Sequence, residues 1–190
     1  SLWLTPQTTT PYVHAEIDVK NGPVVIEIGT PVLGFVNDAF FRYVTDLGVV
    51  GADKGKGGKY LLVGPDYKGE IPEGYFVFKT SAYRHWALMR IAAKPGETKQ
   101  AIEAFKKTFK IYPLADASNP KPTGFINLSN KRYNTIHAND VSFYDELNEV
   151  IQYEPASAWD PELVGLAGAI GIKKGQTFKP DDRMKAILTE

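Results

Sequence analysis

The stretch from Phe40 to Thr80 constrains the fold of this chain more than any other part of the sequence. It holds three apolar runs rich in Val, Tyr and Phe, separated by two turns rich in Gly, Lys and Asp. β-branched and aromatic residues favour strands, and Gly and Asp favour the turns between them. Parallel strands would need long crossover connections, and no helical pattern occurs before residue 97. The stretch therefore predicts antiparallel strands.

The flanking sequence continues the same pattern. Tyr12–Val19 alternates between polar and apolar residues, which predicts a strand with one solvated face. Asn21-Gly22 separates this run from Val24–Ile28, and Asn-Gly is typical of a hairpin turn, so we predict that these two strands pair. The other predicted strands are Val32–Val36, Ala39–Asp46, Lys59–Val63, Gly74–Lys79 and Trp86–Ala92. Strands at this spacing indicate an antiparallel sandwich or barrel.

The hydrophobic period changes at Glu97. Apolar residues then recur at helical spacing up to Tyr112, which predicts a helix over about 97–112. After a Pro- and Asn-rich linker, further helices are predicted over 140–153 and 162–171, the last with Asp160-Pro161 at its start. The prediction is an α+β fold, with a β-sandwich module over 1–112 and a helical segment over 113–190.

Composition excludes several kinds of function. The 190 residues carry 22 Lys and Arg against 22 Asp and Glu, so no charge excess favours nucleic acid as a partner. No apolar run approaches the roughly 20 residues that span a bilayer. The chain has no Cys, which excludes disulfides and thiolate nucleophiles. Its three His residues are not spaced as metal ligands, and we predict neither a metal nor a cofactor.

Segments along nearly the whole chain carry a family resemblance. They are Thr5–Tyr12, Asp18, Gly22–Val25, Asn37–Arg42, Thr45–Gly48, the Gly/Lys-rich loop 51–59, Tyr60–Leu62, Gly64–Gly69, Pro72–Tyr75, Ile111–Leu114, Phe125–Asn127 and Tyr133–Asn139. With them the chain resembles the bacterial family called Domain of Unknown Function 1254.

The resemblance implies an immunoglobulin-like β-sandwich, a helical segment, and then a β-rich C-terminal module, Domain of Unknown Function 1214, that this sequence lacks. Many members carry export signals, so it also implies a periplasmic or secreted protein. The family implies no reaction. The apolar start at Ser1, without an initiator Met, and a helix start at Asp181 close to the end also predict a fragment of a longer protein.

The Gly/Lys-rich loop invites comparison with a phosphate-binding loop. The spacing fails, because Lys59 is followed by Tyr60 and not by Ser or Thr. We interpret the segment as a mobile loop between two strands.

Five side chains remain as candidates for binding a ligand. His14 and Asp18 share the polar face of the first strand, which also suits a solvated surface. Arg42 and Asp46 lie four residues apart on a predicted apolar strand, where they form an ion pair or grip an anion. His137 precedes a predicted helix, so it either belongs to a structural cap or binds an anion there.

We predict a non-catalytic β-sandwich module of an exported bacterial protein, acting in binding or assembly with its own C-terminal module. The alternative is a hydrolase whose site forms at the seam between the two modules. Convergence of Arg42, Asp46, His14 and His137 on one cavity favours the enzyme, and dispersal favours the module. A homo-oligomer, a small anionic ligand and a sugar or lipid groove lined by aromatic residues stay open.

Overall fold

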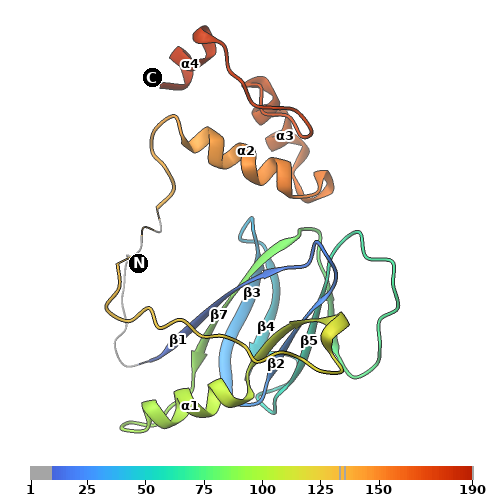
Figure 1. Cartoon of the computed structure of the whole chain (residues 1–190), viewed down its shortest axis with the longest axis vertical. Helices are drawn as coiled ribbons and strands as arrows, with labels where there is room; N and C mark the ends of the chain where they lie inside the picture. The colour runs from blue at the N-terminus through green and yellow to red at the C-terminus, as the bar shows by residue number, and fades with distance from the viewer. Residues whose placement is uncertain (1–9, 133, 135, 190) are drawn as a thin grey trace. The chain divides into compact units, whose positions relative to one another are not determined.

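The computed structural model describes residues 10–132, 134 and 136–189, and the chain divides into two compact units, residues 5–128 and residues 129–190 (Figure 1). The first unit holds the strands and one helix, and the second is helical. The first unit extends to Leu128, and Phe125 near its end packs its ring against Phe105 and Phe109. The predicted boundary at residue 112 stays a prediction. Parts of the family resemblance, before Thr10 and at positions 133 and 135, lie outside the described residues.

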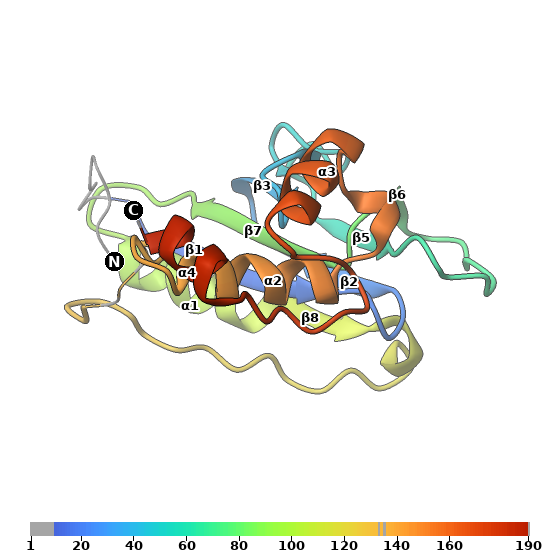
Figure 2. The same cartoon turned by 90° about the horizontal axis from the view of Figure 1, so that it is seen from above.

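The strands form two four-stranded sheets. Sheet A has the order β1 (Tyr12–Asp18), β7 (Arg84–Ile91), β3 (Val32–Asp38), β4 (Tyr43–Gly48), and sheet B has the order β6 (Phe76–Lys79), β5 (Gly58–Val63), β2 (Val24–Ile28), β8 (Lys110–Pro113) (Figures 1 and 2). Neighbouring strands are antiparallel except β5 and β6, which run parallel. The predicted α+β class is confirmed, the prediction of a wholly antiparallel sheet is wrong, and the immunoglobulin-like topology stays a prediction.

One hydrophobic core joins the two sheets. Ile17 and Met89 of sheet A belong to the same buried cluster as Ile26 and Leu62 of sheet B, so the sheets pack face to face as a sandwich. Helix α1 (Thr98–Thr108) contributes Phe105 to this cluster. Removing apolar surface from water stabilises by about 25 cal/mol per Å², which makes this core the main source of the unit's stability.

The predicted hairpin between the first two strands is wrong. β1 pairs with β7 in sheet A, and β2 pairs with β5 and β8 in sheet B, so the Asn21-Gly22 turn carries the chain from one sheet to the other. The two strands differ in burial, because β2 is covered on both faces at Val24, Val25 and Ile26, whereas β1 keeps one exposed face. A turn signal shows where a chain reverses, but the demand for burial decides which sheet receives the next strand.

The predicted helix over 97–112 ends early. α1 stops at Thr108, and Lys110–Pro113 form strand β8 along the edge of β2. There Tyr112 is buried, and its hydroxyl donates a 3.0 Å hydrogen bond to Glu27 Oε2. Pairing gives the backbone of β2 a hydrogen-bonded neighbour on its second side, which outweighs the helical spacing of the apolar residues.

The second unit contains helices α2 (Phe143–Tyr153), α3 (Pro161–Ala169) and α4 (Asp182–Thr189). Asp160 caps α3 as predicted, with its Oδ1 accepting from Glu162 N at 2.8 Å. A small core formed by Ile151, Ala167 and Ile172 holds the unit together. None of the described helices is long and apolar enough to cross a bilayer.

Candidate binding face

The outer face of sheet A, which points away from the sandwich core, carries ordered rows of aromatic and polar side chains. One row places Glu16, Trp86, Asn37 and Tyr43 side by side on β1, β7, β3 and β4. The next row places His14, Leu88, Phe35 and Asp46 in the same order. Residues opposite each other on paired strands share a face, so these eight side chains form one surface.

Trp86 lies at the centre of an aromatic cluster on this face. Its ring centroid lies 5.2 Å from that of Phe35, 5.1 Å from that of Phe41 and 6.0 Å from that of His14. Phe41 keeps 75% of its surface exposed and Tyr43 keeps 66%. Large aromatic side chains are costly to leave in water, so an exposed group of them is typical of a binding surface.

The tight turn between β3 and β4 presents Phe41. Oδ1 of the buried Asp38 accepts hydrogen bonds from the backbone N–H groups of Phe40 and Arg42, at 2.8 and 3.0 Å. Phe41 follows in the left-handed region at φ 60°, a conformation that bulky residues rarely adopt. The turn therefore holds an aromatic ring where Gly or Asn would be less strained.

The predicted ion pair between Arg42 and Asp46 does not form. The strand begins at Tyr43 and not at Ala39, so Arg42 belongs to the turn, where its Nε donates to Asp38 Oδ2 at 2.7 Å. Its Nη2 donates to Ser81 Oγ at 3.3 Å, and its guanidinium lies 4.9 Å from the ring centre of Phe40. Arg42 thus ties the turn together.

The other candidate residues make contacts with residues other than Arg42. Asp46 lies on the outer face beside Tyr43, whose pKa is raised by desolvation and then by the charge and hydrogen bond of this carboxylate. His14 is on the same face, on edge strand β1, and the exposed carboxylate of Asp18 accepts from Lys20 N. His137 is exposed in the helical unit, with Nδ1 2.7 Å from Ala138 O. In the sandwich, His14 and Asp46 lie on the same outer face of sheet A. None of His14, Asp18, Arg42 and Asp46 lines either of the two best-formed pockets.

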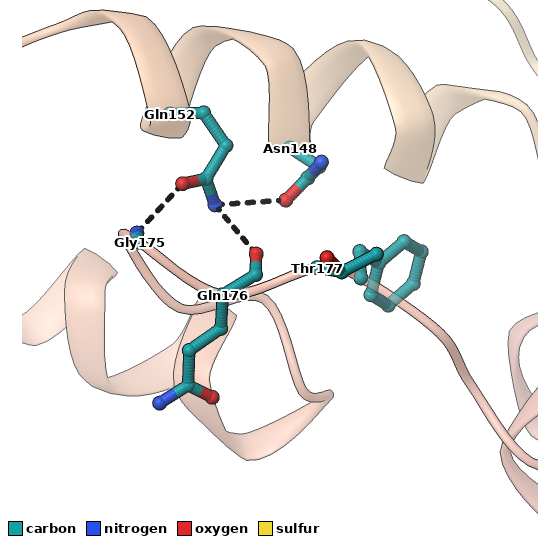
Figure 3. Close-up of a pocket in the computed structure, with 6 residues that line it drawn as sticks. Asn148, Gln152, Gly175, Gln176 and Thr177 are labelled. Atoms are coloured by element: carbon teal, nitrogen blue, oxygen red, sulfur yellow. Dashed lines mark hydrogen bonds between the residues drawn. The ribbon is translucent and has the colours of Figure 1, made fainter.

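Both of these pockets are shallow. A groove of about 450 Å³ in the helical unit is lined by Asn148, Gln152 and the segment 175–178 (Figure 3). Gln152 Nε2, with two N–H groups, donates to Lys173 O at 2.8 Å and shares its hydrogens with Asn148 Oδ1 at 3.1 Å and Gln176 O at 3.2 Å. Its Oε1 accepts from Gly175 N at 2.7 Å. The amide is therefore fully engaged in holding that segment against α2. The second pocket, of about 260 Å³, lies beside Leu33 and Arg90 in the sandwich.

The comparisons with known proteins agree with this fold. The family described as "Protein of unknown function (DUF1254)" matches residues 1–113. The chain belongs to this family. The resemblance noted in the sequence is thus confirmed, whereas the continuation into Domain of Unknown Function 1214 stays a prediction. No curated protein was found to match the chain.

A solved structure resembles this DUF1254 chain over nearly its full length. The crystal structure of the VPA0106 protein from Vibrio parahaemolyticus matches with a TM-score of 0.70 and 14% sequence identity, covering 97% of this chain and 47% of that one. The chain therefore spans about half the length of that protein. At this identity the likeness shows the fold alone.

Two buried polar side chains of this DUF1254 chain, His85 and Asp53, make local hydrogen bonds. His85 is buried, its Nδ1 lies 3.1 Å from Tyr83 O, and burial lowers its pKa. In the loop 51–59, interpreted as mobile, the buried Asp53 accepts from Tyr60 Oη at 2.6 Å and from Gly57 N at 2.9 Å. That loop is tied at its base. Among the described residues no three His, Asp or Glu are placed to hold a metal ion.

Proposed function

We propose that this chain is the non-catalytic part of a longer, exported bacterial protein, and that it works by assembling with its own C-terminal module. The observation that carries the proposal is helix α3. Leu163, Val164 and Leu166 on this helix are 53%, 46% and 62% exposed. A helix that is apolar on all sides is usually buried within a protein. We therefore infer that another part of the protein covers the exposed side of α3.

The remainder of the same protein is the occupant that best fits this surface. The fold neighbour from Vibrio parahaemolyticus has about twice the length that this chain covers. A segment linked to α3 is present at high effective concentration, so even a modest apolar contact holds it in place. The alternative of a hydrolase at the same seam gains no support within the sandwich, because His14, Arg42 and Asp46 do not line its pocket beside Leu33 and Arg90.

The test compares Leu166→Glu in this chain and in the longer protein that contains the proposed C-terminal module. In the chain alone Leu166 is exposed to solvent, so we expect the substitution to change the free energy of unfolding by no more than about 0.5 kcal/mol. In the longer protein the charge would be buried without a partner, and we expect a loss of about 2 kcal/mol or more. Denaturant titration measures both values.

Glu162→Gln, on the same helix and also exposed, serves as the matched control and should be neutral in both proteins. Equal effects of Leu166→Glu in the two proteins would contradict the proposal. Concentration-dependent dimerisation of the chain that Leu166→Glu abolishes would assign α3 to contacts between copies instead.

A further inference from the structure

We propose that the outer face of sheet A binds a glycan, with a pyranose ring stacked on the aromatic cluster of Trp86, Phe35 and Phe41. This inference concerns the sandwich unit and does not depend on the assembly proposed for α3. It rests on the hydrogen-bonding groups that lie beside the aromatic rings on this face.

The rows on this face match the two chemistries of a sugar. A pyranose ring presents apolar C–H groups on its faces and hydroxyl groups around its edge. Trp86 has Glu16 as its neighbour on β1 and Asn37 as its neighbour on β3. The exposed ring of Phe41, which contacts Trp86, thus offers a surface for stacking, and the carboxylate and amide that flank Trp86 offer acceptors and donors to hydroxyls.

The second row places two adjacent apolar side chains, Leu88 and Phe35, between the polar His14 and Asp46. Phe35 stands edge-on to Trp86, at an interplanar angle of 80°, and its neighbour on β4 is Asp46. Tyr43 and Asp46 lie at the edge of this face, on strand β4. A lipid tail bound here would cover the charged or amide groups beside Trp86 and Phe35, and these groups would lose their water without gaining a partner. These polar neighbours therefore favour a glycan over a lipid.

The geometry of Phe41 indicates that its ring is held for binding. The residue combines a left-handed backbone, 75% exposure and contact with Trp86. Strain and exposure both lower stability, and residues that break local rules without a structural gain cluster at functional sites. The hydrogen bonds that Asp38 accepts keep the turn in this shape.

The experiment titrates the 190-residue protein with soluble oligosaccharides derived from glucan, mannan and galactan, and follows the indole N–H signal of Trp86 by nuclear magnetic resonance. We expect at least one of these probes to shift that signal in a saturable way. Phe41→Gly should weaken this binding roughly 2- to 10-fold, the effect of removing one aromatic contact. The same change should raise the thermal midpoint, because Gly adopts positive φ without strain.

Lys54→Gly is the matched control. Lys54 also has a positive φ, of 51°, but lies in the loop between β4 and β5. This change should raise stability in the same way and leave glycan binding unchanged. Trp86→Ala should abolish binding, and if that variant does not fold, Phe41→Gly decides the question.

Three outcomes would overturn the proposal. The first is that none of the three probes shifts the Trp86 signal in folded protein. The second is that the probes bind equally well to Phe41→Gly. In the third, the same signals shift with protein concentration in the absence of sugar, which would make the face a contact between copies of the chain.

Discussion

Tyr60 shows how one buried hydroxyl fixes a glycine-rich loop. Its side chain is fully buried, and its hydroxyl donates to Asp53 Oδ1 while it accepts from Gly48 N at 3.3 Å and from Asp53 N at 3.2 Å. Burial, followed by the hydrogen bond to Asp53, raises the pKa of Tyr60 to about 12. The hydroxyl therefore stays protonated and closes the base of loop 51–59 over a wide range of pH.

We expect Tyr60→Phe to lower the free energy of unfolding by about 1–3 kcal/mol, since it leaves Asp53 and the Gly48 N–H without their buried partner. Denaturant unfolding gives the value. Tyr67→Phe is the control, because the Tyr67 hydroxyl makes only an exposed bond to Glu70 O. If Tyr60→Phe lowers the free energy of unfolding no more than Tyr67→Phe does, the Tyr60 hydroxyl does not stabilise the loop.

At the scale of the elements, the end of β4 passes very close to β3. Gly48 has a positive φ of 77°, and a Cβ atom placed there would lie 2.0 Å from Val32 O. The two strands are neighbours in sheet A, and the inward-facing Val32 and Leu47 are fully buried in the core. No other residue can therefore occupy this position without moving backbone.

Gly48→Ala should accordingly cost roughly 2–5 kcal/mol, from left-handed strain together with a collision inside a packed sheet. Gly96→Ala is a matched control, because Gly96 has a similar φ of 82° with open space around its Cβ position. Gly96→Ala should lower the free energy of unfolding only by the cost of the left-handed backbone conformation, about 1–2 kcal/mol. Thermal unfolding of both variants measures the difference, and equal losses would show that the close approach to Val32 does not matter.

At the scale of the whole molecule, the chain consists of two units with separate cores. The sandwich core draws on both sheets and α1, whereas the helical unit relies on a small cluster around Ile151, Ala167 and Ile172. The segment after Leu128 contains no helix or strand before α2 among its described residues. Exposed chain without secondary structure is the usual site of proteolytic cleavage.

Limited proteolysis should therefore cut first between residues 129 and 142 and leave a stable product close to residues 5–128. That product should unfold in one cooperative transition, with a midpoint within a few degrees of the sandwich transition in the intact chain, because its core is complete. Mass spectrometry identifies the cut and calorimetry gives the midpoints. A first cut inside the sandwich would argue against two independent units.

The sequence by itself determined the local features of this protein. Alternation placed β1, turn residues separated the strands, and the cap at Asp160 marked the start of α3. These features depend on backbone preferences and side-chain periods within a few residues, which a sequence displays directly. The family could likewise be recognised from short segments, and the match to residues 1–113 confirmed it.

Only the tertiary structure decided which strands pair and which charges meet. β1 joins β7 rather than β2, Lys110–Pro113 leave the helical pattern to pair with β2, and Arg42 finds Asp38 instead of Asp46. The physical reason is that partners are chosen by burial and by backbone hydrogen bonding between distant segments, for which the sequence carries no local signal. The same holds for the outer face of sheet A, whose rings come from four strands and meet only when the sheet forms.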